Sequence, residues 1–130
     1  MGQGKGCLTG SLTAATTTTG GDALSLANPE GVALIITRFI LRITTPATGA
    51  ANVDAGVAAD GSTSADDLLD GQDVGSAAAV LDNIDDQGTN GQSVLEWDSD
   101  EYVTVTPSAT LAGLVGRSEE RRVGKECATG

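Results

Sequence analysis

Hydrophobic and polar residues alternate along several short stretches of this chain, the pattern of β-strands with one buried face. The clearest stretch is Val32–Thr45. Its first face is nearly all apolar and is expected to point into the core; it carries Ala33, Ile35, Thr37, Phe39, Leu41 and Ile43. A helix is the competing interpretation, but the β-branched residues disfavour it.

The second face of this stretch is apolar only in its first half, at Val32, Leu34 and Ile36, and becomes basic at Arg38 and Arg42. An apolar half-face needs a cover, either a loop or a neighbouring subunit. The three apolar residues are therefore candidate interface residues, and the chain is expected to form a homo-oligomer. The two arginines are added as interface candidates that would pair with carboxylates, within the subunit or across the contact.

Further strands are expected over 8–19, 23–27, 52–59, 92–97, 101–106 and 111–115, separated by turn-forming residues. Leu68-Leu69 could form one helical turn, 77–84 fits a short strand or a short helix, and Asn90-Gly91 predicts a hairpin. In the strand expected over 101–106, Val103 and Val105 lie on the face opposite Tyr102, Thr104 and Thr106. Short strands at this spacing predict an all-β fold, an antiparallel β-sandwich of jelly-roll type with about eight short strands.

The end of the chain has a different character. Arg117–Cys127 reads RSEERRVGKEC, which resembles the translation of a sequencing adapter. The alternative is a charged C-terminal helix or tail. The first interpretation divides the chain into a flexible N-terminus at 1–7, a single β-sandwich domain at 8–116 and a non-native tail at 117–130. It also predicts that the last strand is interrupted after Val115 and that deletion of 117–130 leaves the thermal midpoint nearly unchanged.

The charge of the chain excludes one class of partner. The formal net charge is −11, and it becomes −12 without residues 117–130, because fifteen acidic residues then face three basic ones. Without a basic patch the chain cannot release counterions from phosphates, so no nucleic-acid partner is expected. No apolar run is long enough to span a membrane, so no membrane partner is expected either.

Catalysis is also disfavoured, because the chain has no histidine. A Ser-His-Asp or Cys-His site cannot be built, and Cys7 has no base to activate it. Calcium is the one ligand chemistry that the acidic turns suggest, since it prefers several hard oxygens. The first candidate ligands are Asp98, Asp100 and Glu101; further acidic clusters lie at 82–86 and 66–73. We prefer the simpler interpretation that these acidic turns are solvated. In that case no cofactor is expected and the protein is not expected to be an enzyme.

Several phrases resemble a group of small tailed-phage virion proteins. They are NPEG, ALIITR, TTPATGAANVDAGVA, DNIDDQGTNG, YVTVT and LAGLVG, at 28–31, 33–38, 44–58, 82–91, 102–106 and 111–116. The resemblance covers 23–116 and implies a β-sandwich located in the virion, a head-decoration or capsid-associated structural protein that assembles with other virion proteins. In such relatives an aromatic and β-branched strand follows Leu-Val-Gly, and this chain departs from them there.

Two other functions stay open at this point. A carbohydrate- or surface-binding module of a fibre could use Trp97 and Tyr102 to stack on a glycan. A calcium-dependent extracellular fibre or adhesion module could use the acidic turns instead. A glycan array would test the first alternative, and calcium-dependent assembly would test the second.

Overall fold

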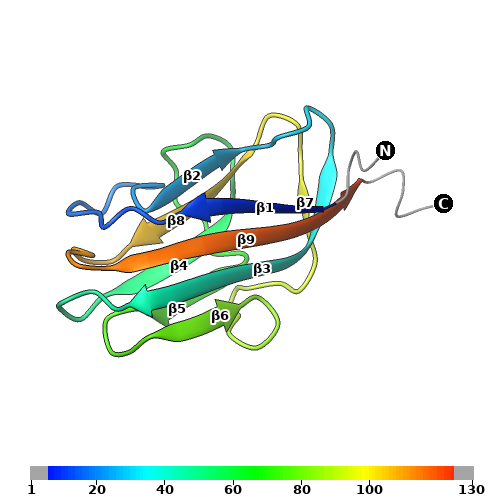
Figure 1. Cartoon of the computed structure of the whole chain (residues 1–130). Helices are drawn as coiled ribbons and strands as arrows, with labels where there is room; N and C mark the ends of the chain where they lie inside the picture. The colour runs from blue at the N-terminus through cyan, green and yellow to red at the C-terminus, as the bar shows by residue number, and fades with distance from the viewer. Residues whose placement is uncertain (1–5, 125–130) are drawn as a thin grey trace.

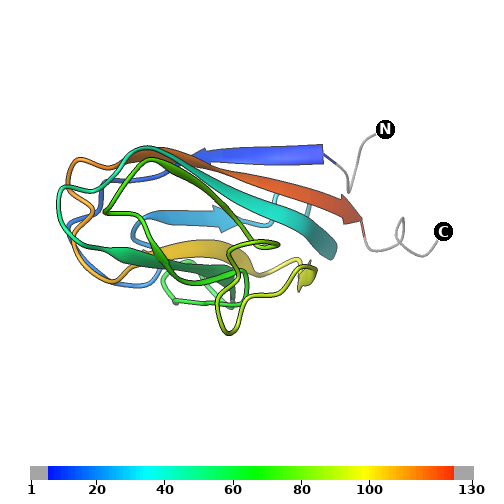
Figure 2. The same ribbon diagram turned by 90° about the horizontal axis from the view of Figure 1, so that it is seen from below.

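A computed structural model describes residues 6–124, which form nine β-strands in two antiparallel sheets and contain no helix. Figure 2 shows the two sheets as stacked layers, so the predicted all-β sandwich is confirmed. Between residues 6 and 124 there is no helix that is long and apolar enough to cross a membrane.

The first sheet has the strand order β1-β9-β3-β6 (Figure 1). Its strands are β1 (Gly6–Ser11), β9 (Val115–Gly124), β3 (Leu34–Thr45) and β6 (Ala79–Asp82). The short strand β7 (Leu95–Trp97) pairs with the first residues of β3, and β6 pairs with its later residues. β9 therefore lies in the interior of the sheet, between β1 and β3.

The second sheet has the order β2-β8-β4-β5. Its strands are β2 (Leu24–Ala27), β8 (Tyr102–Pro107), β4 (Asn52–Ala58) and β5 (Leu69–Asp73). Loops cover part of its outer side. The Thr104 hydroxyl donates to the Thr63 carbonyl at 2.9 Å, and the Gly21 N–H donates to the Thr106 hydroxyl at 3.0 Å. Position 56 in β4 requires glycine, because the segment that contains Asp67 passes close to it. A Cβ at this position would collide with Asp67.

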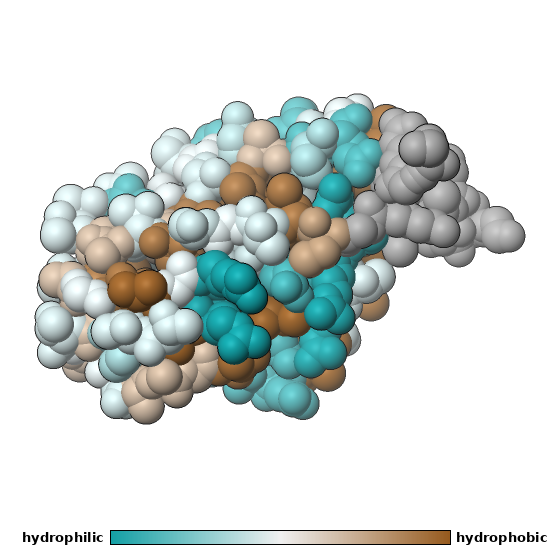
Figure 3. Space-filling model, in the orientation of Figure 1, coloured by the Kyte–Doolittle hydropathy of each residue, from teal (hydrophilic) through white to brown (hydrophobic). Residues whose placement is uncertain are grey.

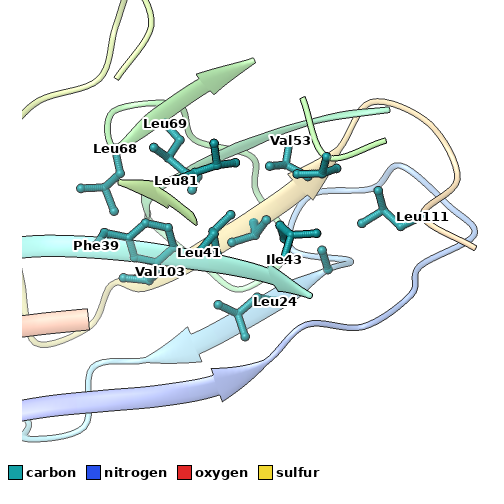
Figure 4. Close-up of a cluster of buried hydrophobic side chains, with 14 of the residues drawn as sticks. Leu24, Phe39, Leu41, Ile43, Val53, Leu68, Leu69, Leu81, Val103 and Leu111 are labelled. Atoms are coloured by element: carbon teal, nitrogen blue, oxygen red, sulfur yellow. The ribbon is translucent and has the colours of Figure 1, made fainter. Parts of the chain in front are cut away.

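The core between the sheets is aliphatic, with Phe39 and Trp97 as its only fully buried aromatic side chains among the described residues. Figure 4 shows Phe39, Leu41 and Ile43 of β3 packing toward Val53 and Val103 of the opposite sheet. Val103 and Val105 are both fully buried, and Thr104 and Thr106 on the opposite face of β8 are buried as well.

The residues that β3 points into the core differ in part from the sequence prediction. Phe39, Leu41 and Ile43 point inward as expected, but in the first half Leu34 and Ile36 are the fully buried residues and Ile35 is only half-buried. The pairing with β9 shifts between Ile36 and Arg38, which marks a bulge. A bulge adds one residue and exchanges the two faces of a strand.

Local predictions around the loops were also wrong in part. Leu69 begins β5 rather than belonging to a helical turn. Asn90-Gly91 does not close a hairpin, since β6 and β7 both pair with β3 and not with each other. The ambiguous stretch 77–84 contains β6, and residues 111–114 form a turn instead of a strand.

Both predicted ends of the domain need correction. Gly6 and Cys7 belong to β1, so the N-terminal segment outside the fold is shorter than 1–7, and Met1–Lys5 lies outside the described residues. The last strand is not interrupted, because β9 continues through Gly124. Residues 117–124 thus take part in the fold, against the prediction. Backbone pairing explains this outcome, since it accepts almost any side chain. The adapter-like origin of 117–127 stays a prediction, and 125–130 lies outside the described residues.

Candidate interaction surface

The outer face of the first sheet gathers most of the positive charge described in this acidic molecule. Beyond the bulge, β3 points Arg38 and Arg42 outward, and β9 places Arg121 and Arg117 directly opposite them. Figure 3 shows strongly hydrophilic side chains in the middle of this face, with hydrophobic patches beside them. The two chain segments thus form a basic stripe on an otherwise acidic protein.

Arg38 is held in place by an ion pair. Its guanidinium donates to the Asp82 carboxylate at 2.7 Å, and the Asp82 side chain is 8% exposed. Burial alone would raise the pKa of Asp82. The N–H groups of Asp85 and Ile84 and the Arg38 guanidinium donate to its carboxylate and together lower that pKa instead. This part of the stripe is structural, because Arg38 ties β3 to the turn after β6.

Arg42 is different, because it is exposed and makes no ion pair within residues 6–124. Three shallow hollows meet at its side chain, the largest with a volume of about 430 Å³. Val80 and Val115 flank it, at 55% and 56% exposure. A basic side chain between exposed aliphatic ones is suited to bind a protein surface that carries a carboxylate beside apolar groups. We define this area, Arg42 with Val80 and Val115, as the Arg42 surface.

The predicted apolar interface in β3 is not on the surface. Leu34 and Ile36 have no exposed area within the single chain, and only Val32, in the loop before β3, is partly exposed at 37%. The bulge is the physical reason, since it turns these two residues into the subunit's own core. The second sheet of the same chain, and not a neighbouring subunit, covers Leu34 and Ile36. Oligomerisation itself stays a prediction.

The candidate calcium ligands lie in the turn between β7 and β8. The Glu101 carboxylate accepts a hydrogen bond from the Asp98 N–H at 2.8 Å, and the Glu101 N–H donates to the Asp98 carbonyl at 3.1 Å. The turn also holds the core, because the Trp97 indole N–H donates to the Glu101 carbonyl at 2.9 Å. These bonds make the turn self-contained, and Asp100 is exposed beside it.

The other acidic side chains also cap turns. Asp73 accepts hydrogen bonds from Ser76 and Gly75, which lower its pKa. Asp60 accepts hydrogen bonds from Ser62 and Thr63, which lower its pKa as well. In the part of the chain that the structure describes, no group of three acidic or cysteine side chains is placed to hold a metal ion. Calcium binding stays an untested prediction.

Sequence reasoning missed a set of buried polar side chains on the inner face of β9. Ser118 and Glu120 have no exposed area, and the Arg122 side chain is 9% exposed. Alternation from Val115 places these three residues on one face and so carries the signal. An adapter-like tail, in contrast, is expected to lie outside the fold.

Of the three residues, Glu120 has the environment that is least favourable for its charged form. Its cross-strand neighbours are Phe39 on β3 and Leu8 on β1. Burial raises the pKa of Glu120 to about 7, although the nearby Ser118 hydroxyl and Arg122 guanidinium offset part of the effect. Neither carboxylate oxygen completes a hydrogen bond of normal geometry with the described residues.

Comparison with known proteins gives a relationship at the level of the fold. The scan against protein families found no match, and no curated protein matches the sequence. Among solved structures the chain is similar to a chain of the capsid of Ralstonia phage GP4, with a TM-score of 0.59 and 18% sequence identity. The match covers 92% of this chain and 84% of that one, so it extends over most of the sandwich and is not limited to a single motif.

Proposed function

We propose that this chain is a non-enzymatic structural protein of a tailed-phage virion, capsid-associated or head-decorating. The observation that carries the proposal is the shared fold with a chain of the capsid of Ralstonia phage GP4 over 92% of this sequence. The virion-like phrases between residues 23 and 116 point to the same class. The lack of histidine in the sequence is consistent with a purely structural role.

The Arg42 surface supports a docking role in particular. It is exposed, lies on the broad outer face of a sheet and combines Arg42 and the facing Arg117, neither of which makes an ion pair with a described residue, with aliphatic side chains. Carboxylates on a capsid shell would meet two exposed arginines here that make no ion pair with a described residue, Arg42 and Arg117. Net acidity elsewhere would orient the approach to the shell.

Immunogold electron microscopy tests the location. Antibodies raised against the chain are expected to label the heads of tailed particles in the source virus. Label confined to tail fibres would contradict a capsid role and favour the glycan-binding alternative. Label on cells alone would contradict any virion role.

A binding experiment tests the Arg42 surface. The purified chain is sedimented with empty heads assembled from the shell protein of the same virus. Arg42→Gln should lower the affinity about tenfold without lowering the thermal midpoint, whereas Ser99→Glu, in the exposed turn after β7, should leave the affinity unchanged. Both variants change the net charge by the same amount, so equal losses would show a general charge effect and refute this docking surface.

A further inference from the structure

The inward side chains of β9 do not match the slot that the strand occupies. Its inner wall consists of apolar residues from β3, β1 and the opposite sheet. Cross-strand neighbours of the three inward β9 residues include Ile36 for Arg122, Phe39 for Glu120 and Leu41 for Ser118. All three neighbours on β3 are fully buried. An apolar strand would complete this wall, and β9 brings a cation, a carboxylate and a hydroxyl.

The mismatch leaves polar atoms without partners. The Ser118 hydroxyl, both Glu120 carboxylate oxygens, and Nε and Nη1 of Arg122 are buried and make no hydrogen bond to any described residue. Arg122 makes one ion pair, from Nη2 to Glu30 at 3.2 Å. Native interiors leave few such groups, because each unpaired buried group is costly. Five in one strand set β9 apart from every other strand described here.

The outer face of β9 shows a second, independent mismatch. Arg121 lies directly opposite Arg38, and Arg117 lies directly opposite Arg42. Like charges at directly opposed positions destabilise a pair of strands. Arg121 is partly compensated by Glu119 on its own strand at 3.0 Å. Carboxylates at the positions of 117 and 121 would instead pair with both β3 arginines.

We propose that the slot between β1 and β3 is a strand-acceptor site for another polypeptide, an extended segment with aliphatic residues facing inward and acidic residues facing Arg38 and Arg42. Such a segment replaces β9 and forms the same backbone hydrogen bonds with both neighbours. A second copy is not the occupant, because an exchanged β9 would bring the same three polar side chains inward. That the partner is a virion protein rests on the function proposed above; the slot itself does not.

A peptide experiment with the full chain tests the site. The fluorescent probe VGEVEVEVVG follows the register of 115–124, with valine at the three inward positions and glutamate at those opposite the arginines. The control VGVEVEVEVG has the same composition with inside and outside exchanged. The probe should bind at least tenfold more tightly, measured by anisotropy. It should also accelerate trypsin cleavage after Arg117 and Arg121, because β9 is released.

A variant with a well-matched β9 provides the second arm. The triple substitution Ser118→Val, Glu120→Val and Arg122→Val should raise the thermal midpoint and abolish probe binding, since the slot is then filled by the chain itself. If the triple variant is stabilised but the wild-type chain binds neither peptide, the slot serves its own chain and the acceptor proposal is wrong. Equal binding of both peptides would also overturn it. None of these outcomes depends on where immunogold finds the protein.

Discussion

Glu120 makes a sharp prediction about the pH dependence of stability. Its carboxyl is fully buried between Phe39 and Leu8, and its pKa is raised from 4.5 to about 7. The folded state therefore holds a proton that the unfolded chain releases at lower pH. Below pH 4.5 the group is protonated in both states, and its ionisation costs nothing. Between pH 4.5 and 7 stability falls, and above pH 7 the loss is complete.

The size of the loss follows from the pKa difference. One pKa unit corresponds to about 1.4 kcal/mol, so this group should remove about 3 kcal/mol of unfolding free energy between pH 4.5 and 8. Asp54 and Asp67, whose pKa values burial also raises, change stability in the same direction, so the wild-type curve alone does not isolate Glu120. Comparison with Glu120→Gln does, because the amide does not titrate.

Urea unfolding monitored by the fluorescence of buried Trp97 measures this effect. The wild-type free energy should fall more steeply with pH than that of Glu120→Gln, by about 3 kcal/mol over the window. Absolute stabilities do not decide the matter, since the buried amide has its own desolvation cost. Parallel curves for the two proteins would refute the buried, unpartnered carboxylate.

Four further outcomes follow from the structure. Truncation after Gly116 should abolish the cooperative thermal transition, because it removes the strand between β1 and β3; an unchanged midpoint would restore the view that the tail lies outside the fold. Asn83→Ala should cost about 2–4 kcal/mol in urea unfolding, since its side chain serves three backbone groups, whereas exposed Asn90→Ala should stay within about 0.5 kcal/mol. Sodium chloride at molar concentration should raise the midpoint by screening the net charge of −11, and a flat or falling midpoint would defeat this reasoning. Calcium should act no more strongly than magnesium at matched ionic strength, and a calcium-specific rise would reveal a site at Asp98–Glu101.

Periodicity predicted the fold class well, because burial in a sandwich follows the two-residue repeat of a strand. Phe39, Leu41, Val103 and Val105 are inside for this reason. Alternation does not reveal where the repeat slips. Thr37 fits either face of β3, so the bulge next to it could not be read from the residues, and the faces of Leu34 and Ile36 were assigned the wrong way round.

The loop after β6 could not be derived from local turn signals. Asn90-Gly91 is a strong hairpin dipeptide, but the segment is organised by Asn83 instead. Its amide oxygen accepts from the Phe39 N–H at 2.8 Å, and its amide nitrogen donates to the carbonyls of Gln92 and Ser93. These are contacts between distant parts of the chain, and they outweigh the preference of two residues. Such contacts also explain why the Arg42 surface was only half anticipated, since Val80 and Val115 come from other strands.

The position of β9 also affects how the molecule forms during synthesis. The first sheet lacks an interior strand until β9 has been synthesised. The edges of β1 and β3 that pair with β9 therefore stay unpaired while the ribosome adds some eighty further residues after β3. Pairing between segments so far apart in sequence is slow, and open edges invite association with other chains. The first sheet should therefore be completed only after β9 has been synthesised, and chaperone demand should be highest in the interval before that.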